Sequence, residues 1–403
     1  MAGAFRIDAR DGSARAGVLH TGHGDVRTPA FVPLASTATV KTLHASEVAE
    51  LGYEMVLGNT FHLFIQPGAD YVEEMGGLHE FMGWPRPIVT DSGGFQVFSM
   101  GHGGVAEEIK RRRGDGRESR ILAIDEEGVR FRSYLDGRER FMGPETSMEV
   151  QARLGSDVAL AFDECTPFHV ERDYTRRSME RTHRWLDRCV RWHAENAPPG
   201  QLLYGIVQGG VHEDLRDESA ARVAAAPVDG IAVGGSLGQG KDEMREVLRW
   251  SLRGLDDERP RHLLGIGDVD DVVHAVGAGV DSFDCATPTR LARHGTALVP
   301  DPSARWRLDV TRNEARGSRA PLAEGCPCAA CREHTRGYLH YLARARELTA
   351  ARLITLHNLT FMAELMRGLR AAIEAGSFAA YAERVQRGEA PYQAPAVREG
   401  RAG

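Results

Sequence analysis

The first candidate for chemistry in this chain is a carboxylate, Asp284, which ends a short apolar run within Gly279–Arg290. Past Pro288 the chain carries two cations, Arg290 and Arg293. An acidic side chain at the carboxyl end of a buried strand, with cations just beyond it, suits work on a phosphorylated substrate. A single Asp in such a place more often begins a turn. The interpretation therefore depends on whether other strand ends repeat the pattern.

Three other apolar runs end in polar side chains of the same kind. Asp91 begins the sequence Asp-Ser-Gly-Gly-Phe-Gln, Asp163 begins Asp-Glu-Cys, and Gln208 precedes two glycines. If these runs are neighbouring strands, the carboxylates and the amide meet at one mouth. Glycine pairs let the backbone approach a flat ligand, on which Phe95 could stack. For Phe95 alone, simple packing is an equal alternative.

A second group with defined chemistry is the Cys-x-Cys-x-x-Cys pattern of Cys326–Cys331, with His357 a further 26 positions along the chain. Three thiolates and one imidazole complete the tetrahedral set that Zn²⁺ takes in structural sites. Spacing does not choose His357 over His334 or His340, and three reduced thiols in a turn are the alternative. The apolar helix predicted over Leu353–Leu369 favours His357, because it offers that side chain a fixed rotamer.

Length and composition indicate a globular cytoplasmic enzyme. The 403 residues, 42% hydrophobic and 27% charged, allow one large α/β barrel or two ordinary domains. The sequence has no apolar run of signal-peptide or membrane-span length, and its six cysteines do not resemble a secreted disulfide framework. The net charge is −7, yet residues 289–370 hold 14 Lys+Arg against 7 Asp+Glu. A phosphate-binding face and solvated arginine-rich helices are equal explanations of that basic segment.

Eight short apolar segments in the first 290 residues are the elements that must position these side chains. Runs of this kind are typical of strands buried on both faces of a parallel sheet. Amphipathic helices are predicted between several of them, over Glu171–Asn196, Lys241–Gly254 and Val269–Ala278. Eight such units predict a closed (β/α)8 barrel with its active site at the carboxyl ends of the strands. The segments are Ala30–Leu34, Met55–Asn59, Pro87–Asp91, Val158–Asp163, Leu202–Gln208, Gly230–Gly235, His262–Gly267 and Ser282–Asp284.

The same pattern predicts the division of the chain. Residues 1–300 are expected to form the barrel, with a loop and hairpin inserted at about residues 100–135. Residues 301–388 are expected to form a zinc-binding subdomain with C-terminal helices that close on the barrel. The Pro-, Ala- and Arg-rich end, residues 389–403, is expected to be a disordered tail. The Arg111–Arg113 triplet in the insertion is more typical of a solvated run than of a contact.

Taken in order, these motifs resemble the bacterial tRNA-guanine transglycosylases (the queuine tRNA-ribosyltransferase family), the base-exchange enzymes of queuosine formation. The matches extend from about Thr28 to Met366. They are Thr28-Pro-Ala-Phe-Val-Pro, Leu57-Gly-Asn-Thr-Phe-His-Leu, Thr90-Asp-Ser-Gly-Gly-Phe-Gln, Phe162-Asp-Glu-Cys, Gly205-Ile-Val-Gln-Gly-Gly, Phe283-Asp-Cys-Ala-Thr-Pro-Thr-Arg and the cysteine set followed by His357-Asn-Leu. The resemblance implies an irregular (β/α)8 TIM barrel carrying a zinc subdomain. It also implies one structural Zn²⁺, bound by Cys326, Cys328, Cys331 and His357.

The resemblance further implies roles for the strand-end residues. Asp284 is expected to attack the anomeric carbon of the wobble guanosine and give a covalent RNA–enzyme intermediate, with Asp91 as general acid/base. Two basic side chains that follow the nucleophile, Arg290 and Arg293, are expected to bind phosphates beside the flipped nucleotide. The expected base-reading set is Asp163, Gln208 and the backbone at Gly235, with Phe95 and Leu264 as walls of the pocket.

The expected substrates are the wobble guanine of the tRNAs for Asp, Asn, His and Tyr, with a U-G-U anticodon loop, and 7-aminomethyl-7-deazaguanine. In Gly235–Gln239 the chain departs from the usual bacterial loop, because it is one residue shorter and Gln239 stands where Glu is common. Queuine therefore stays open as the incoming base. The sequence also leaves open a non-catalytic RNA-binding relative, a DNA-modifying relative and an unrelated barrel hydrolase. A homodimer without membrane association is expected, since family members commonly form homodimers.

Overall fold

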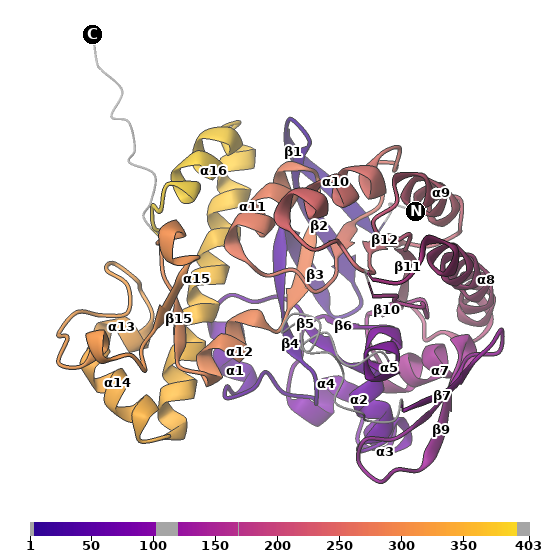
Figure 1. Ribbon diagram of the computed structural model, residues 1–403, viewed down its shortest axis with the longest axis horizontal. Helices are drawn as coiled ribbons and strands as arrows, with labels where there is room; N and C mark the ends of the chain where they lie inside the picture. The colour runs from indigo at the N-terminus through magenta and orange to yellow at the C-terminus, as the bar shows by residue number, and fades with distance from the viewer. Residues whose placement is uncertain (1–3, 102–119, 168, 393–403) are drawn as a thin grey trace.

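Figure 1 shows the computed structural model of the chain, which describes residues 4–101, 120–167 and 169–392. The Arg111–Arg113 triplet and the part of the predicted tail beyond residue 392 lie outside the described residues. Within those ranges, no helix combines the length and the apolarity that crossing a membrane requires.

Eight parallel strands close into the barrel that the sequence predicts, in the order β4, β5, β6, β10, β11, β12, β13, β14 and back to β4. Each forms because a short, β-rich apolar run can be buried on both faces. Some strands end before their predicted ends: β10 ends at Leu160, three residues before Asp163. The bounds are β4 Ala30–Ala35, β5 Val56–Gly58, β6 Ile88–Thr90, β10 Val158–Leu160, β11 Leu202–Val207, β12 Gly230–Val233, β13 Arg261–Leu263 and β14 Ser282–Cys285.

An antiparallel sheet that the sequence analysis did not predict closes the amino end of the barrel. It consists of β1 (Phe5–Asp11), β2 (Ala14–Thr21) and β3 (Gly24–Thr28), and leads directly into β4. Its side chains join the inward-facing residues of the strands in one buried cluster, which includes Phe5, Leu19, Val26, Val32, Leu57, Leu160 and Ile206. Buried Arg15 of β2 also donates from Nε to Asp281, just before β14, at 2.8 Å. The closed amino end leaves the carboxyl ends of the strands for a site.

Helices cover the outside of the barrel, and the three predicted amphipathic helices are confirmed as α8 (Arg172–Asn196), α10 (Lys241–Leu252) and α11 (Val269–Gly277). The outward-facing strand residues pack against them in a second cluster, which includes Phe31, Trp185, Leu248 and Phe283. The other helices on the barrel are α1 Ala45–Glu50, α2 Thr60–Ile65, α3 Ala69–Glu74, α4 Gly77–Met82, α5 Gly94–Gly101, α7 Pro144–Leu154 and α9 Glu213–Ala224.

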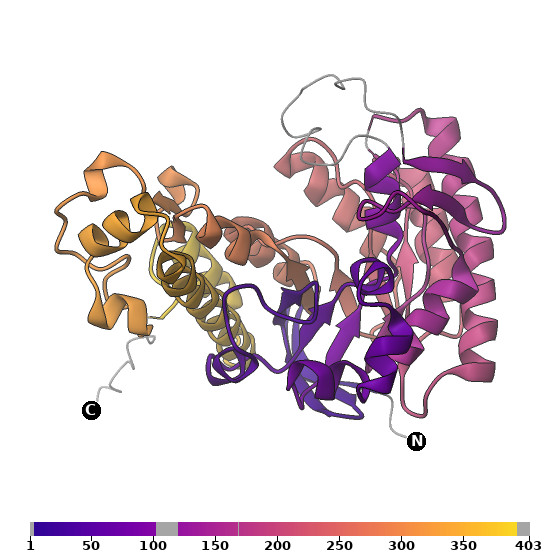
Figure 2. The ribbon, with the colours of Figure 1, turned by 90° about the horizontal axis from the view of Figure 1, so that it is seen from below.

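A three-stranded antiparallel sheet lies between β6 and β10 in the chain, made of β7 (Ile121–Ile124), β8 (Val129–Arg132) and β9 (Glu139–Met142). Its alternating pattern buries one face, where the ring of Phe131 lies 5.3 Å from that of Phe61 on α2. Figure 2 shows this sheet and the C-terminal part of the chain on opposite sides of the barrel.

The C-terminal part is built on the long helix α15 (Leu348–Glu374), which packs against α12 (Thr287–Arg293) and against β1, β2 and β4. Leu359 and Leu365 of α15 belong to the cluster around the barrel, whereas Leu353 belongs to a separate cluster with the cysteines. One helix therefore connects both cores. The other elements are β15 Thr296–Leu298, β16 Arg307–Asp309, the short 3₁₀ turns Pro302–Ala304 and Asn313–Ala315, α13 Ala329–Glu333, α14 Arg336–Arg344 and α16 Phe378–Gln386.

Candidate active site

The carboxyl ends of β6, β10, β11 and β14 bring four of the polar residues singled out from the sequence to one mouth. Gln208 Nε2 donates to Asp163 Oδ2 at 2.6 Å. The negative charges of Asp284 and Asp163 both add to the raised pKa of Asp91, as expected for carboxylates at one end of the barrel. The parallel barrel therefore assembles these groups from segments far apart in the chain.

Asp91 is held by the amino end of α2. The backbone N–H of Thr60 donates to its Oδ1 at 2.8 Å, and Asn59 Nδ2 and Gln96 Nε2 donate to its Oδ2 at 2.5 and 3.1 Å. Burial raises the pKa of Asp91 to about 7, and the neighbouring negative charges add to that effect against the opposing hydrogen bonds. Near neutral pH this carboxyl group can therefore either give or take a proton.

Asp163 and Gln208 form a buried, hydrogen-bonded pair, in which the acceptor Gln208 Oε1 has no partner among the described residues. Ser92 Oγ donates to Asp163 Oδ1 at 2.6 Å, and Gly94 is required beside it because a Cβ there would lie 2.3 Å from the Asp163 carbonyl oxygen. Burial raises the pKa of Asp163 to about 6 against these hydrogen bonds. Gln208 Oε1 is buried and has no hydrogen-bond partner among the described residues. An unsatisfied acceptor in a polar pocket marks a place for a ligand donor.

The backbone at Gly235 faces this free acceptor. Gly235 has φ +76°, and a Cβ there would lie 2.3 Å from Gln208 Oε1. Arg216 of α9, which the sequence analysis missed, fixes the loop: its buried guanidinium donates to the carbonyl oxygens of Gly210, Gly234 and Ser236 at 2.7, 2.8 and 2.9 Å. An arginine within a polar helix face gives no signal in the sequence, because its role depends on three carbonyl groups that only the fold brings together.

Asp284 lies at the end of β14 and is anchored through one oxygen. Its Oδ1 lies 3.0 Å from His262 Nε2 on the neighbouring strand β13, and accepts from the backbone N–H of Gly265 at 3.3 Å. The side chain of Asp284 is 11% exposed, so it reaches the mouth while most of it is enclosed. His262 was also missed from the sequence, although it begins one of the eight predicted strands.

The remaining predicted site residues lie around this mouth. Phe95, on the first turn of α5, is 46% exposed, so core packing does not account for it. Half-buried Leu264 packs toward Gly234. Arg290 and Arg293 are exposed on α12, one turn apart. Of the two, only Arg290 makes a side-chain hydrogen bond to another described residue, Thr287 Oγ1 at 3.3 Å.

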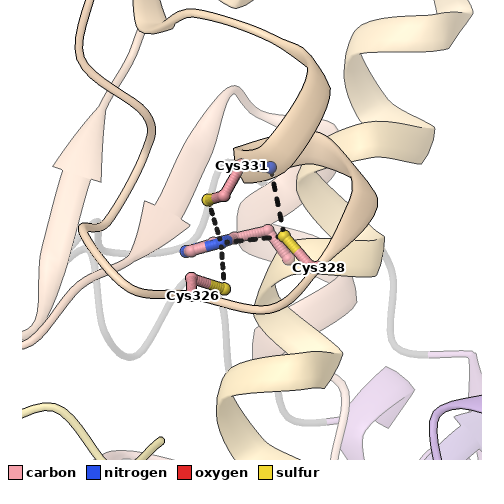
Figure 3. Close-up of side chains that lie close together, drawn as sticks. Cys326, Cys328 and Cys331 are labelled. Carbon is pink, nitrogen blue, oxygen red and sulfur yellow. Dashed lines mark hydrogen bonds between the residues drawn. The ribbon is translucent and has the colours of Figure 1, made fainter. Parts of the chain in front are cut away.

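The cysteines and His357 form a separate candidate metal centre. His357 Nδ1 lies 3.5, 3.6 and 3.3 Å from the sulfur atoms of Cys326, Cys328 and Cys331 (Figure 3). His357 Nε2 donates to the Leu298 carbonyl oxygen at 2.6 Å, which directs Nδ1 and its lone pair toward the thiols. The four residues could therefore hold a metal ion.

The other two histidines near the cysteines in sequence lie elsewhere. His340 Nδ1 bonds the Val310 carbonyl oxygen at 2.8 Å, and the ring of His334 packs against Tyr338 at 5.1 Å between centroids. The structure thus selects His357, which spacing alone did not.

Comparison with known proteins shows that nearly the whole chain matches one family. The sequence model of the family described as "Queuine tRNA-ribosyltransferase" matches residues 10–391. Proteins named queuine tRNA-ribosyltransferase from Roseiflexus sp. (strain RS-1), Symbiobacterium thermophilum and Thiobacillus denitrificans are 48%, 44% and 45% identical to it. These alignments cover 93%, 97% and 94% of this chain and 97%, 93% and 97% of the relatives. The match extends over both the barrel and the cysteine cluster, and the chain therefore belongs to the queuine tRNA-ribosyltransferase family.

Proposed function

We propose that this protein is a tRNA-guanine transglycosylase that replaces the wobble guanine of tRNA with a 7-deazaguanine base. The observation that carries the proposal is the pairing of two different carboxyl groups at one mouth. Among the described residues, Asp284 is anchored through Oδ1 alone, whereas half-buried Asp91 has a pKa of about 7. The names of the relatives support a tRNA substrate.

The first half of the reaction is a displacement at the ribose. A carboxylate oxygen of Asp284 attacks the anomeric carbon, and the bond from that carbon to guanine N9 breaks with its electron pair leaving on the base. Asp91 in its acid form supplies a proton to the departing guanine. The product is an ester between Asp284 and the ribose, and free guanine leaves.

The second half reverses these steps with a new base. Asp91, now a carboxylate, takes the proton from the incoming base, whose nitrogen attacks the anomeric carbon and releases Asp284. Two displacements retain the configuration at that carbon, as in retaining glycosidases. One N-glycosidic bond replaces another, so no hydrolysis step is needed.

The buried polar set beside Asp91 suits the edge of a guanine or 7-deazaguanine. The carboxylate of Asp163 can accept from the ring N–H and the exocyclic amino group. Gln208 Oε1, which lacks a partner among the described residues, is a further acceptor. The backbone at Gly235 completes the edge, with Phe95 and Leu264 as the walls of the pocket. The target nucleotide must leave its stack to reach this depth.

The favoured incoming base is 7-aminomethyl-7-deazaguanine, at the wobble position of the tRNAs for Asp, Asn, His and Tyr. The loop Gly235–Gln239 lacks the common Glu, but the backbone N–H of Gln239 donates to Glu243 Oε2 at 2.7 Å. A carboxylate of α10 thus lies against this loop, where it favours a cationic aminomethyl group. Measuring kcat/KM for this base and for queuine tests the choice, and a preference for queuine of about tenfold or more overturns it.

The metal centre is proposed to hold one structural Zn²⁺. Three thiols and an oriented imidazole fit the closed tetrahedral set of such sites, and the metal would join the cysteine loop to α15. Cys328→Ala is expected to lower bound zinc and the melting temperature together. Cys165→Ala, outside the cluster, is the control. Full zinc content with an unchanged Tm in Cys328→Ala would mean that the ligands are misassigned.

A homodimer is proposed through the C-terminal part. Tyr341 and Leu348, on α14 and at the start of α15, are 64% and 85% exposed, and Tyr338 beside them is 43% exposed. Large exposed apolar side chains are typical of interaction surfaces when they form one patch, as Tyr338 and Tyr341 do one turn apart on α14. A tRNA substrate also implies a cytoplasmic location. Sedimentation of the wild type and of a Tyr341→Glu variant tests the dimer, which the added charges should weaken.

The proposal is tested by exchange of radiolabelled guanine into bulk tRNA and by a denaturing gel for the covalent adduct. Wild-type protein should catalyse exchange and form an RNA adduct, with duplex DNA failing to compete. Asp284→Asn should lose the adduct and keep tRNA binding. Asp8→Asn, an exposed surface carboxylate, should behave as the wild type. An adduct that persists in Asp284→Asn would contradict the assignment of the nucleophile.

A further inference from the structure

His262 lies inside the barrel on β13, between two residues of the adjacent strand β14. Its Nε2 lies 3.0 Å from Asp284 Oδ1, and its Nδ1 lies 2.8 Å from Ser282 Oγ. The residue is only 3% exposed, so the ring cannot turn away into water. Because Ser282 and Asp284 are two positions apart on a strand, both side chains point inward and hold the ring from two sides.

The contacts of His262 assign a hydrogen-bond role to its Nε2 atom. The Asp284 carboxylate can only accept, so His262 Nε2 carries a proton and donates it to Oδ1, while Nδ1 bonds the Ser282 hydroxyl on the other side. The backbone N–H of Gly265 donates to the same oxygen at 3.3 Å. Among the described residues, Asp284 Oδ2 accepts no hydrogen bond, so the two carboxylate oxygens have different surroundings.

We propose that His262 is a positioning residue that makes Oδ2 the attacking oxygen of Asp284, an inference that rests on the proposed function above. A carboxylate at a barrel mouth can otherwise rotate and present either oxygen. Because Oδ1 accepts two hydrogen bonds, rotation of the Asp284 carboxylate would break hydrogen bonds to a charged group. The carboxylate therefore keeps Oδ2, which accepts none among the described residues, toward the substrate.

The same contacts serve both displacements. When Oδ2 bonds to the anomeric carbon, the carbon–N9 bond breaks and Oδ1 becomes the carbonyl oxygen of the ester, still accepting from His262 and Gly265. When the incoming base attacks, the carbon–Oδ2 bond breaks and negative charge returns to the carboxylate. The donors at Oδ1 stabilise that charge without any change of geometry.

The test compares the rate of adduct formation with tRNA affinity in variants of the full-length protein. His262→Phe keeps a ring but removes the donor, and is expected to slow adduct formation in a single turnover by roughly 10- to 100-fold, the range for a hydrogen bond to a charged group. Its Kd for tRNA should stay within about twofold of the wild type, since the ring is buried and only 3% exposed. His262→Gln, which retains a side-chain N–H, should recover most of the rate.

His340→Phe is the matched control, because His340 is also buried and also makes a hydrogen bond, to the Val310 carbonyl oxygen outside the mouth. It should form the adduct at the wild-type rate. A His262→Phe protein with the wild-type adduct rate overturns the inference, as does an equal loss in the Phe and Gln variants.

Ser282→Ala keeps the test decisive if His262→Phe fails to fold. Without the hydroxyl the ring loses one of its two hydrogen-bond partners and is held less firmly against Asp284, so adduct formation should slow several-fold. In a His262→Gln background the same change should have no further effect, because the two residues act as one unit. An unchanged rate in Ser282→Ala overturns the inference. The wild-type protein separates the two hypotheses: a wild type that neither exchanges guanine nor forms an adduct refutes the proposed function, whereas an active wild type with an unchanged rate in His262→Phe refutes only this inference.

Discussion

At the scale of single residues, Asp91 shows how burial sets a proton affinity. Because burial raises its pKa to about 7, the acid form that guanine departure needs is lost as the pH rises above that value. We expect adduct formation to fall about tenfold per pH unit above neutrality, measured in single turnovers. Gln96→Leu removes a donor to the carboxylate and should move the inflection up by about one unit.

Gln66→Leu is the control for this profile, since Gln66 is exposed at the end of α2. It should leave the inflection in place. If the rate of adduct formation did not change from pH 6 to 9, Asp91 would not be the group that transfers the proton.

Gly235 is the second residue whose type is fixed by its surroundings. A methyl group there would meet the free acceptor Gln208 Oε1 at 2.3 Å, and φ +76° is strained for any residue with a Cβ. We expect Gly235→Ala to raise the KM for the incoming base by roughly tenfold or more, as measured by base titration, because the added methyl group would occupy the position proposed for the base edge. Gly240→Ala, where a Cβ meets nothing within 4 Å, should leave that KM unchanged.

At the scale of elements, Asp157 fastens the amino ends of β6 and β10 to the turn before β3. It accepts from the backbone N–H groups of Ile88 and His23 at 2.8 and 3.1 Å, and bonds the rings of His23 and His79 at 2.8 and 3.1 Å. The rings stack with centroids 3.6 Å apart. Although this trio has the residue types of a metal site, four donors already fill the acceptor positions of the carboxylate. We interpret it as a structural contact.

This contact predicts a loss of stability in acid. Burial alone would raise the pKa of Asp157, but hydrogen bonds from His79, Ile88 and His23 lower it to about 2, below its ordinary 3.8. A depressed pKa contributes stability above pH 4 that disappears as the pH falls toward 2, here about 2 kcal/mol. Denaturant melts of Asp157→Asn should therefore show a deficit of about this size at pH 7 that narrows below pH 4.

The control for Asp157 is Asp25→Asn. Asp25 also bonds a histidine ring, at 2.7 Å from His20 Nδ1, but its side chain is 62% exposed. Solvent screens such a pair, and little change in stability is expected. Equal deficits in the two variants would contradict the role given to burial.

At the scale of the whole molecule, α15 connects the metal centre to the helix that follows the nucleophile. Asn358, next to His357, accepts from the backbone N–H of Leu298 at 2.7 Å and donates to the carbonyl oxygen of Pro288 at 2.9 Å. Pro288 belongs to α12, which carries Arg290 and Arg293. The position of these cations relative to Asp284 is therefore fixed by the C-terminal part of the chain.

The exposed arginines of α12 lie one turn apart, just past Asp284, in the basic segment 289–370. If each binds a phosphate, Arg293→Ala should weaken tRNA binding and reduce the slope of log K against log salt by about one unit. Filter binding over a salt series measures both. Arg249→Ala, on the outer helix α10, should change neither. An unaltered slope in Arg293→Ala would make this arginine a solvated surface residue.

The sequence by itself determined the architecture and the types of residue at the site. Eight apolar runs must be buried on both faces, and a parallel barrel satisfies this requirement while placing each polar strand end at one mouth. Asp91, Asp163 and Asp284 could therefore be singled out in advance, as could a thiol-rich metal set. The sheet β1–β3 could not be predicted in advance, because the sequence does not show that the apolar face of this sheet packs against the amino end of the barrel.

Only the tertiary structure decided how these groups act. It placed His357 rather than His334 or His340 among the thiols, because a carbonyl group of β15 orients its ring. It brought Arg216 to three carbonyl groups and His262 to one oxygen of Asp284. It also raised the pKa of Asp91, since desolvation and neighbouring charge depend on distance in space. Residue types follow from local pattern, whereas protonation and orientation follow from contacts between segments that are remote in the chain.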